Sequence, residues 1–154
     1  MDERASGEAY ALLGRARTRL CALPLGHVVE TMRPLPTTPL AGAPAFVAGL
    51  SVIRGQPVPV VDVGALLGSP EPPAATRFVI VRAGDRRVAL ALEAVLGVRV
   101  LPDGKEPLPP LLQEAGAEAV SAVATLDREL LVVLRAGRLV PDALWASLPA
   151  GGPR

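Results

Sequence analysis

Three pairs of short apolar runs, each joined by a few turn-forming residues, restrict what this chain can fold into. The runs are rich in Val, Leu and Ile and comprise Leu50–Ile53 with Val58–Val61, Arg77–Arg82 with Arg86–Leu92, and Ala119–Leu126 with Glu129–Leu134. Such runs across Gly- or Asp-containing turns are typical of β-hairpins. We therefore predict an all-β chain of small barrels or a sandwich, with only brief helical turns.

The two halves of the chain resemble each other. Ala22–Leu25 matches Ala89–Leu92 at an offset of 67 residues, and Val58–Leu67 matches Leu130–Leu139 at an offset of 72. The alternative is a chance likeness between Val- and Leu-rich strands, but the order and spacing of the matches favour a duplication. Two repeats are too few for a solenoid, so we predict two small barrels packed on one another.

The composition excludes several classes of function. With 16 Lys and Arg against 15 Asp and Glu, and only 3% aromatic residues, neither a basic field nor a stacking surface for nucleic acid is expected. The single cysteine, Cys21, excludes an internal disulfide. The single histidine, His27, excludes the common histidine-rich metal sites, and no cofactor is expected.

The first residues and the length of the apolar runs indicate where in the cell the protein is expected. The first ten residues, MDERASGEAY, are polar and acidic rather than typical of a signal peptide. No apolar run approaches the ~20 residues that cross a membrane. A cytoplasmic protein without direct membrane insertion is therefore expected.

Asp62 is the strongest candidate for a catalytic residue. It lies in an apolar strand followed by glycine, as the carboxylate of an aspartic protease does, and a dimeric aspartyl hydrolase is a remote alternative. Val63 stands where a hydroxyl residue is needed, and the second half offers no matching aspartate for a dyad. We expect Asp62 instead to cap the helical turn Val63–Leu67.

Arg54 places a fixed charge at the end of an apolar strand. It is either a solvated hairpin corner or a charge held for a partner. The corresponding stretch of the second half has Leu126 and Asp127 near this position, so the fold itself does not demand an arginine there. We interpret Arg54 as a contact residue.

An ordered series of motifs, from Tyr10 to Leu148, resembles the CheW-like domains. The series is ALPLGHVVETMRP, PLAGAPAF, FVAGLSVIRGQPVPVVDVGALLG, RFVIVRAGDRRVALALEAVLGV and EPLPPLL. The resemblance implies two five-stranded SH3-like β-barrels packed around a shared hydrophobic core. We expect a single domain over residues 8–150, with a first barrel of about residues 17–75 and a second of about residues 76–146, to which an N-terminal strand at 9–14 is a candidate addition.

The resemblance also implies a function without catalysis. Proteins of this family are chemotaxis adaptors that link the cytoplasmic signalling tip of a chemoreceptor to the regulatory domain of a CheA-type histidine kinase. Other CheW-like proteins are further expected partners, and the expected location is the cytoplasm, in receptor clusters.

The receptor side of the family maps onto particular residues here. Arg54 matches the arginine of the (I/L)-R-G motif and Glu30 matches an acidic position, and the two are expected to pair. A receptor helix needs an apolar surface with a few orienting charges. The expected contacts are Glu30, Arg54, Val28, Val29, Leu50 and Val52, with structural roles for Gly49, Gly55, Asp62 and Gly68.

Departures from the family pattern concentrate in the second half. A glycine is missing near Ser121, and Leu134 and Arg135 stand where an acidic residue is usual. An alternative is therefore an accessory member, such as those of gliding-motility chemosensory systems, that binds the receptor or another coupling protein but not the kinase.

Overall fold

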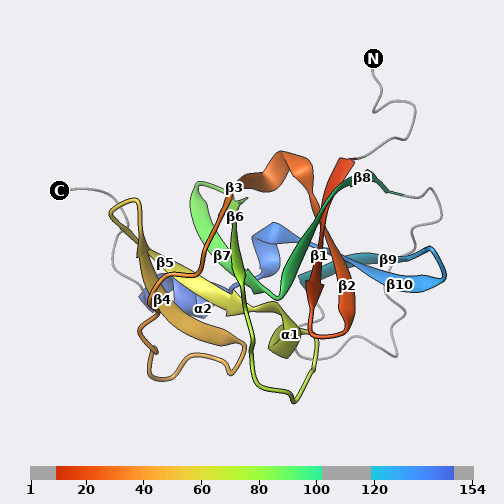
Figure 1. Cartoon of the computed structure of the whole chain (residues 1–154). Helices are drawn as coiled ribbons and strands as arrows, with labels where there is room; N and C mark the ends of the chain where they lie inside the picture. The colour runs from red at the N-terminus through yellow and green to blue at the C-terminus, as the bar shows by residue number, and fades with distance from the viewer. Residues whose placement is uncertain (1–9, 102–118, 148–154) are drawn as a thin grey trace.

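Ten short strands make up most of the part of the chain that the computed structural model describes, residues 10–101 and 119–147 (Figure 1). The strands are β1 (Tyr10–Ala16), β2 (Arg19–Pro24), β3 (Val28–Met32), β4 (Val47–Ile53), β5 (Gln56–Asp62), β6 (Arg77–Ala83), β7 (Arg86–Leu92), β8 (Ala94–Val100), β9 (Val120–Leu126) and β10 (Glu129–Leu134). The helices α1 (Val63–Leu66) and α2 (Asp142–Ser147) are short, and 3-10 turns lie at Leu25–His27 and Ala136–Arg138. The expected all-β class is confirmed.

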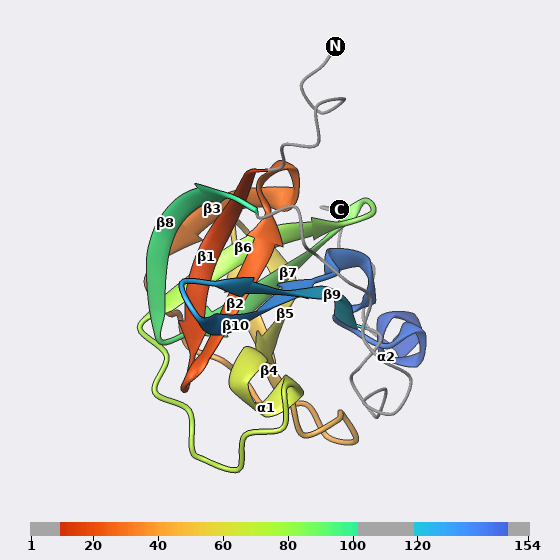
Figure 2. The ribbon, with the colours of Figure 1, turned by 90° about the vertical axis from the view of Figure 1, so that its right-hand side faces the viewer.

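The strands form two five-stranded sheets. One, the terminal barrel, has the order β8-β1-β2-β10-β9, and the other, the central barrel, has the order β3-β6-β7-β5-β4. Figure 1 shows the central barrel on the left and the terminal barrel on the right, and Figure 2 looks onto the terminal barrel. Each sheet contains one parallel pair, β2 with β10 and β5 with β7.

The expected division into barrels of residues 17–75 and 76–146 is wrong. The hairpin β1–β2 pairs with β8–β10, whereas the hairpin β6–β7 completes the sheet of β3–β5. Each barrel therefore combines a hairpin from one half of the chain with three strands from the other half. The physical reason is the parallel pairing, because parallel neighbours cannot be joined by a tight turn and need a long crossover connection. The expected outer limits, residues 8 and 150, lie outside the described residues.

The duplication is visible in the strand register. Val60 pairs with Ala89 in the central barrel and Val133 pairs with Ala22 in the terminal barrel. Since Ala22 and Ala89 correspond at an offset of 67, Val60 corresponds to Val133, and the offset for the later strands is 73 rather than the expected 72.

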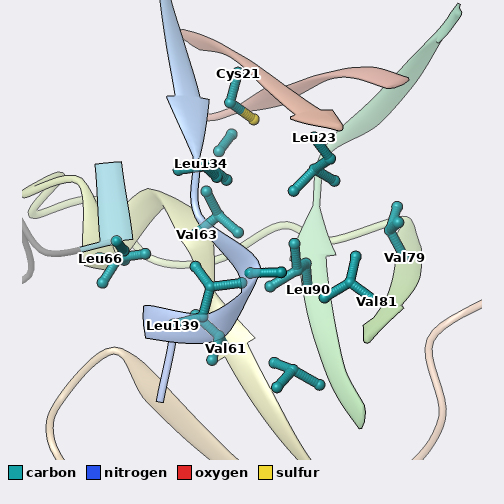
Figure 3. Close-up of a cluster of buried hydrophobic side chains, with 14 of the residues drawn as sticks. Cys21, Leu23, Val61, Val63, Leu66, Val79, Val81, Leu90, Leu134 and Leu139 are labelled. Atoms are coloured by element: carbon teal, nitrogen blue, oxygen red, sulfur yellow. The ribbon is translucent and has the colours of Figure 1, made fainter. Parts of the chain in front are cut away.

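The described residues form three apolar clusters. One lies within the terminal barrel, around Leu13, Leu20 and Leu131, and a second within the central barrel, around Phe78 and Ile80. A larger shared cluster lies between the barrels (Figure 3). Strands such as β2 and β7 alternate between two of these clusters, so they are buried on both faces. This explains why their sequences are nearly continuous in apolar residues rather than alternating.

Several local expectations can be compared with the structure. The three predicted hairpins are present, and the segment His27–Met32, which could be read as helix or strand, is largely the strand β3. The predicted helix near Asp142 is α2, and its Trp145 lies against the Arg86 guanidinium, 4.7 Å from the ring centroid. Among the described residues, no helix is long and apolar enough to span a membrane.

Candidate functional site

Glu30 and Arg54 form an ion pair between the two edge strands of the central barrel. Glu30 lies on β3, and Arg54 follows β4 at the turn into β5. The Arg54 guanidinium donates from Nε to Oε2 of Glu30 at 3.1 Å and from Nη2 to Oε1 at 2.6 Å. The ion pair predicted from the sequence is present. Its two hydrogen bonds fix both side chains where the edge strands β3 and β4 approach each other.

The backbone at Arg54 is unusual for an arginine. Arg54 has φ of 54° and Gly55 has φ of 77°, so both central residues of the turn are left-handed. A turn of this kind favours Asn-Gly or Gly-Gly, because only short or absent side chains adopt the conformation without strain. An arginine is therefore not the residue that the turn itself prefers.

The pair is accessible from solvent. The Arg54 side chain is 72% exposed, and that of Glu30 is 25% exposed. Hydrogen bonds from Arg54 lower the pKa of the Glu30 carboxyl, and the nearby charges of Arg54 and Arg87 act in the same direction. Glu30 thus remains ionised to a lower pH than a free glutamate.

The expected apolar contacts differ in how much surface they offer. Val52 is 71% exposed, whereas Leu50 is half-buried. Val28 packs against the shared cluster, and Val29 packs against the cluster inside the central barrel. Val52 is therefore the main exposed apolar side chain of the set, and Val28 and Val29 are half-buried.

The three glycines expected to be structural all have positive φ, and for Gly49 there is also a steric reason. Gly49 has φ of 145°, and a Cβ there would lie 2.0 Å from the Thr38 carbonyl oxygen. Thr38 forms two backbone hydrogen bonds with Leu50, so this close approach protects the edge of β4. Gly55 occupies the second left-handed position of the β4–β5 turn, and Gly68, at the end of the α1 segment, also has positive φ.

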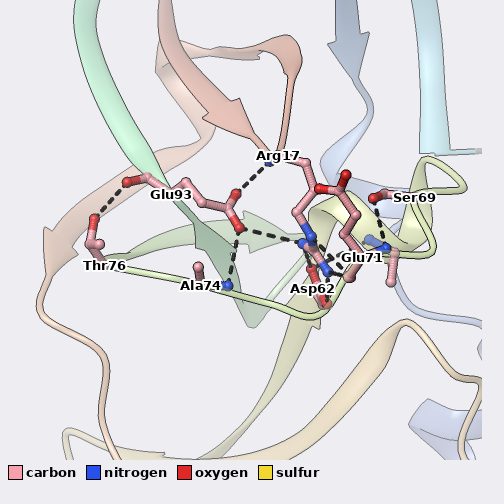
Figure 4. A network of polar contacts seen from close by, with 8 residues as sticks. Arg17, Asp62, Ser69, Glu71, Ala74, Thr76 and Glu93 are labelled. Carbon is pink, nitrogen blue, oxygen red and sulfur yellow. Dashed lines mark hydrogen bonds and ion pairs between the residues drawn. The ribbon is translucent and has the colours of Figure 1, made fainter.

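Asp62 has the expected capping role and a second partner that the sequence did not predict. Its Oδ1 accepts a hydrogen bond from the Ala65 N–H at the start of α1, at 3.4 Å. The Arg17 guanidinium donates to both of its oxygens, at 2.5 and 2.9 Å (Figure 4). The Arg17 side chain is only 5% exposed, so this is a buried ion pair between the turn of one barrel and a strand end of the other.

The same guanidinium fastens the segment between α1 and β6. The Arg17 guanidinium donates to the Glu71 carbonyl oxygen. The backbone N–H of Arg17 donates to the Glu93 carboxylate at 2.6 Å. Glu93 also accepts from the Ala74 N–H. Figure 4 shows Asp62, Glu71 and Glu93 around Arg17, with Ala74 on the far side of Glu93. We call this set, Arg17 with Asp62, Glu71, Ala74 and Glu93, the inter-barrel clasp.

Asp62 has a structural role in the clasp, and its surroundings are not those of a catalytic aspartate. A catalytic dyad requires two carboxyl groups that share a proton. Asp62 and Glu93 both contact the Arg17 guanidinium, so the described partner of each carboxylate is a cation and not a second carboxyl group. Gly64 completes the arrangement, because a Cβ there would lie 2.1 Å from Nη1 of Arg17.

Two features were not predicted from the sequence. The buried ion pair of Arg17 is one, because its partners are distant in the chain. Along β8, Leu96, Val98 and Val100 are 51%, 49% and 42% exposed, and Tyr10 on the neighbouring strand is 56% exposed. The second feature is this row of exposed side chains, because nothing in the sequence of the strand indicates that its apolar side faces solvent. An exposed apolar edge strand is typical of an interaction surface.

Comparisons with known proteins agree on one family. A family model described as CheW-like domain matches residues 11–144. The chain is 30% identical to protein FrzA of Myxococcus xanthus over 125 residues, which cover 79% of this chain and 78% of FrzA. It is 26% identical to the chemotaxis protein CheW of Rhizobium meliloti (strain 1021) over 110 residues, which cover 70% and 71% of the two chains.

A solved structure has the same fold. The crystal structure of the scaffolding protein TtCheW from Thermoanaerobacter tengcongensis superposes with a TM-score of 0.69 at 22% sequence identity. The match covers 83% of this chain and 89% of that one. At this identity the likeness concerns the arrangement of the two barrels.

Proposed function

The chain belongs to the CheW-like domain family, a family of noncatalytic scaffold proteins of chemotaxis-type signalling, and from this premise we propose that it couples chemoreceptor signalling tips to a CheA-type histidine kinase. It does so as an adaptor in the cytoplasm, within receptor clusters and alongside other CheW-like proteins. One surface contacts the receptor, and a separate surface contacts the regulatory domain of the kinase.

One observation carries the receptor side of this proposal. Arg54 occupies a left-handed turn position that favours asparagine or glycine, yet its charge is held in place by Glu30 and remains largely exposed. The turn does not require this arginine, so its exposed charge is available to a partner. Beside it, Val52 and Leu50 offer apolar surface to an amphipathic receptor helix, with the ion pair as the orienting charge.

The turn geometry also supplies the decisive variant. Arg54→Asn removes the charge and suits the left-handed backbone, so the hairpin should fold at least as well as in the wild type. We expect it to weaken binding to a receptor signalling tip roughly fivefold, as for the loss of one exposed charge contact. Arg54→Glu should weaken binding further, because two carboxylates would then face each other.

Pairwise calorimetry with a receptor signalling tip and with a kinase regulatory domain tests this directly. Arg128→Glu, in the β9–β10 turn of the other barrel, is the matched control and should leave receptor binding intact. Receptor binding that is unchanged in both Arg54 variants would refute the proposed contact.

The titration with the kinase regulatory domain tests the alternative that this chain is an accessory member that does not bind the kinase. The likeness to FrzA and the departures around Leu134 in the second half favour testing it. Binding to the receptor tip without measurable binding to the kinase domain would identify an accessory coupling protein, and strong kinase binding would exclude one.

A further inference from the structure

Equivalent positions in the two barrels carry different charges at one end of the sheets. In the duplication, Arg15 of β1 corresponds to Arg82 of β6, at the offset of 67 residues. Their cross-strand partners, Leu20 and Arg87, correspond at the same offset. In the same way, Glu129 at the start of β10 corresponds to Gln56 at the start of β5. Glu129 lies opposite Leu126 in its hairpin, and Gln56 lies opposite Ile53.

In the terminal barrel this end is neutralised. The Arg15 guanidinium donates to both oxygens of Glu129, across the strand that lies between them. Leu20 lies on the intervening strand, opposite Arg15. It is 4% exposed and belongs to the cluster inside the barrel. The terminal barrel therefore ends in a satisfied ion pair over an apolar residue.

In the central barrel the same end lacks its carboxylate. Gln56 replaces the glutamate, and Arg87 replaces the leucine, so two exposed arginines lie directly opposite each other. Arg82 donates to the Gly26 carbonyl oxygen at 3.0 Å, which satisfies a hydrogen bond but no charge. Like charges at directly opposite positions destabilise a sheet, so the fold gains nothing from this pair on its own.

The described surroundings supply no ion pair for these two arginines, although the charge of Arg87 does act on Glu30. Strand alternation places Arg82 on the face of Ile80, and Arg87 on the face of Ala89, at the end of the interior row of the central barrel. Glu30 is nearby, but Arg54 occupies both of its oxygens. Neither Arg82 nor Arg87 forms an ion pair with any carboxylate within residues 10–101 and 119–147, Asp85 of the adjoining turn included.

We propose that Arg82 and Arg87 form a docking site for an aspartate or glutamate side chain on an acidic segment of a partner protein, which takes the place that Glu129 has in the terminal barrel. Guanidinium groups bind carboxylates through two parallel hydrogen bonds, so two arginines side by side suit such a side chain. The site goes beyond the proposed receptor contact, because it uses neither Arg54 nor the apolar residues of β4.

The probe is a blocked peptide, (Glu-Ser)4, with (Gln-Ser)4 as its neutral counterpart, titrated into the full chain while arginine side-chain resonances are followed by NMR. (Glu-Ser)4 should shift the Nε–Hε signals of Arg82 and Arg87, with an affinity that falls as salt is added. The double variant Arg82→Gln, Arg87→Gln should weaken this binding about tenfold.

Gln56→Glu is the sharper variant, because it restores the carboxylate of the terminal barrel. It should abolish peptide binding and raise the melting temperature, since the arginines then have an internal partner. The double variant Arg77→Gln, Arg138→Gln removes the same net charge from exposed positions elsewhere and should bind as the wild type does.

Three results with the peptides and variants would overturn the site, and a fourth comes from competition with phosphate. The three are unchanged binding in Gln56→Glu, an equal loss in the Arg77 and Arg138 control, or equal binding of (Gln-Ser)4. Displacement of (Glu-Ser)4 by inorganic phosphate at equal concentration would indicate a general anion site and would likewise overturn a docking site for acidic protein segments.

Discussion

Arg17 shows how one side chain can hold two barrels in place. Its guanidinium is buried between Asp62 and the Glu71 carbonyl oxygen, and it lies over Gly64 with no room for a Cβ. Hydrogen bonding to Asp62 raises the pKa of Arg17, so the guanidinium keeps its proton to a higher pH than that of a free arginine. Removing one partner of such a pair leaves the other buried and uncompensated.

Arg17→Ala should therefore destabilise the protein by about 3 kcal/mol. Urea unfolding followed by circular dichroism measures the change. Arg19→Ala, at an exposed position two residues away, should cost little and serves as the control. Equal stability of the two variants would show that the clasp contributes little.

Cys21 predicts a specific dependence of stability on pH. Burial raises the pKa of the Cys21 thiol from its ordinary value of 9.0 to about 12. Between these values the unfolded chain loses the thiol proton while the folded chain keeps it, so the unfolded state is favoured as pH rises. The loss amounts to about 1.4 kcal/mol per pH unit within this window.

Unfolding free energies at pH 8 and pH 10, for the wild type and for Cys21→Ala, isolate this effect. The wild type should lose more stability over this interval than the variant does. The same burial should make the folded thiol unreactive toward Ellman's reagent at pH 8. An identical pH dependence in both proteins would contradict the assignment.

At this scale the sequence revealed residues whose partners are close in the chain or known from the family. Asp62 caps the helix that follows it, and Glu30 pairs with Arg54 as the family resemblance implied. Arg17 could not be recognised, because a turn arginine is usually solvated and its carboxylate partner is 45 residues away. Which pairs of distant charges meet is decided by tertiary packing.

At the scale of elements, β4 depends on a close approach of two backbones. Gly49→Ala should destabilise the protein by roughly 2 kcal/mol or more, because its Cβ would overlap the Thr38 carbonyl and its φ is 145°. Thermal unfolding by calorimetry gives the measurement. Gly137→Ala, where no atom lies within 4 Å of the added Cβ, should change stability little.

The strands were predictable where apolar runs and turn residues coincide. The hairpins β4–β5, β6–β7 and β9–β10 have all three features: two apolar runs, a short turn and a left-handed residue in it. The segment His27–Met32 was ambiguous, since its half-buried residues alternate poorly and a bulge interrupts its pairing with β6. Exposure was harder to predict than strand type, as Val98 on β8 illustrates.

At the scale of the whole molecule, the shared cluster joins the two barrels into one folding unit. It contains Leu12 and Leu134 from the terminal barrel as well as Val61 and Leu90 from the central one. Separating the barrels would expose this surface to water, at ~25 cal/mol per Å² of apolar area. We therefore expect one cooperative unfolding transition.

Trp145 fluorescence and far-UV circular dichroism test this expectation, because Trp145 packs against the shared cluster while the ellipticity reports on all strands. The two curves should coincide across the denaturant range. Separate midpoints would show that the barrels unfold independently.

The duplication was detectable from the sequence, but the assignment of strands to barrels was not. Matching Ala22–Leu25 with Ala89–Leu92 identifies equivalent strands, and both are indeed central strands of their sheets. Nothing in those residues states which half of the chain provides the neighbours. The simplest assumption, that each repeat closes its own barrel, failed because β2 and β7 each pair in parallel with a strand of the other repeat.

This exchange of hairpins has a consequence for how the chain behaves when it is cut. The segment between Ser69 and Thr76 is the junction of the two repeats, and neither side of it holds a complete sheet. The molecule is in effect a domain-swapped dimer whose two protomers share one polypeptide. A nicked chain should therefore assemble as a heterodimer of fragments, with a stability that depends on concentration, and the same geometry allows two intact copies to trade halves.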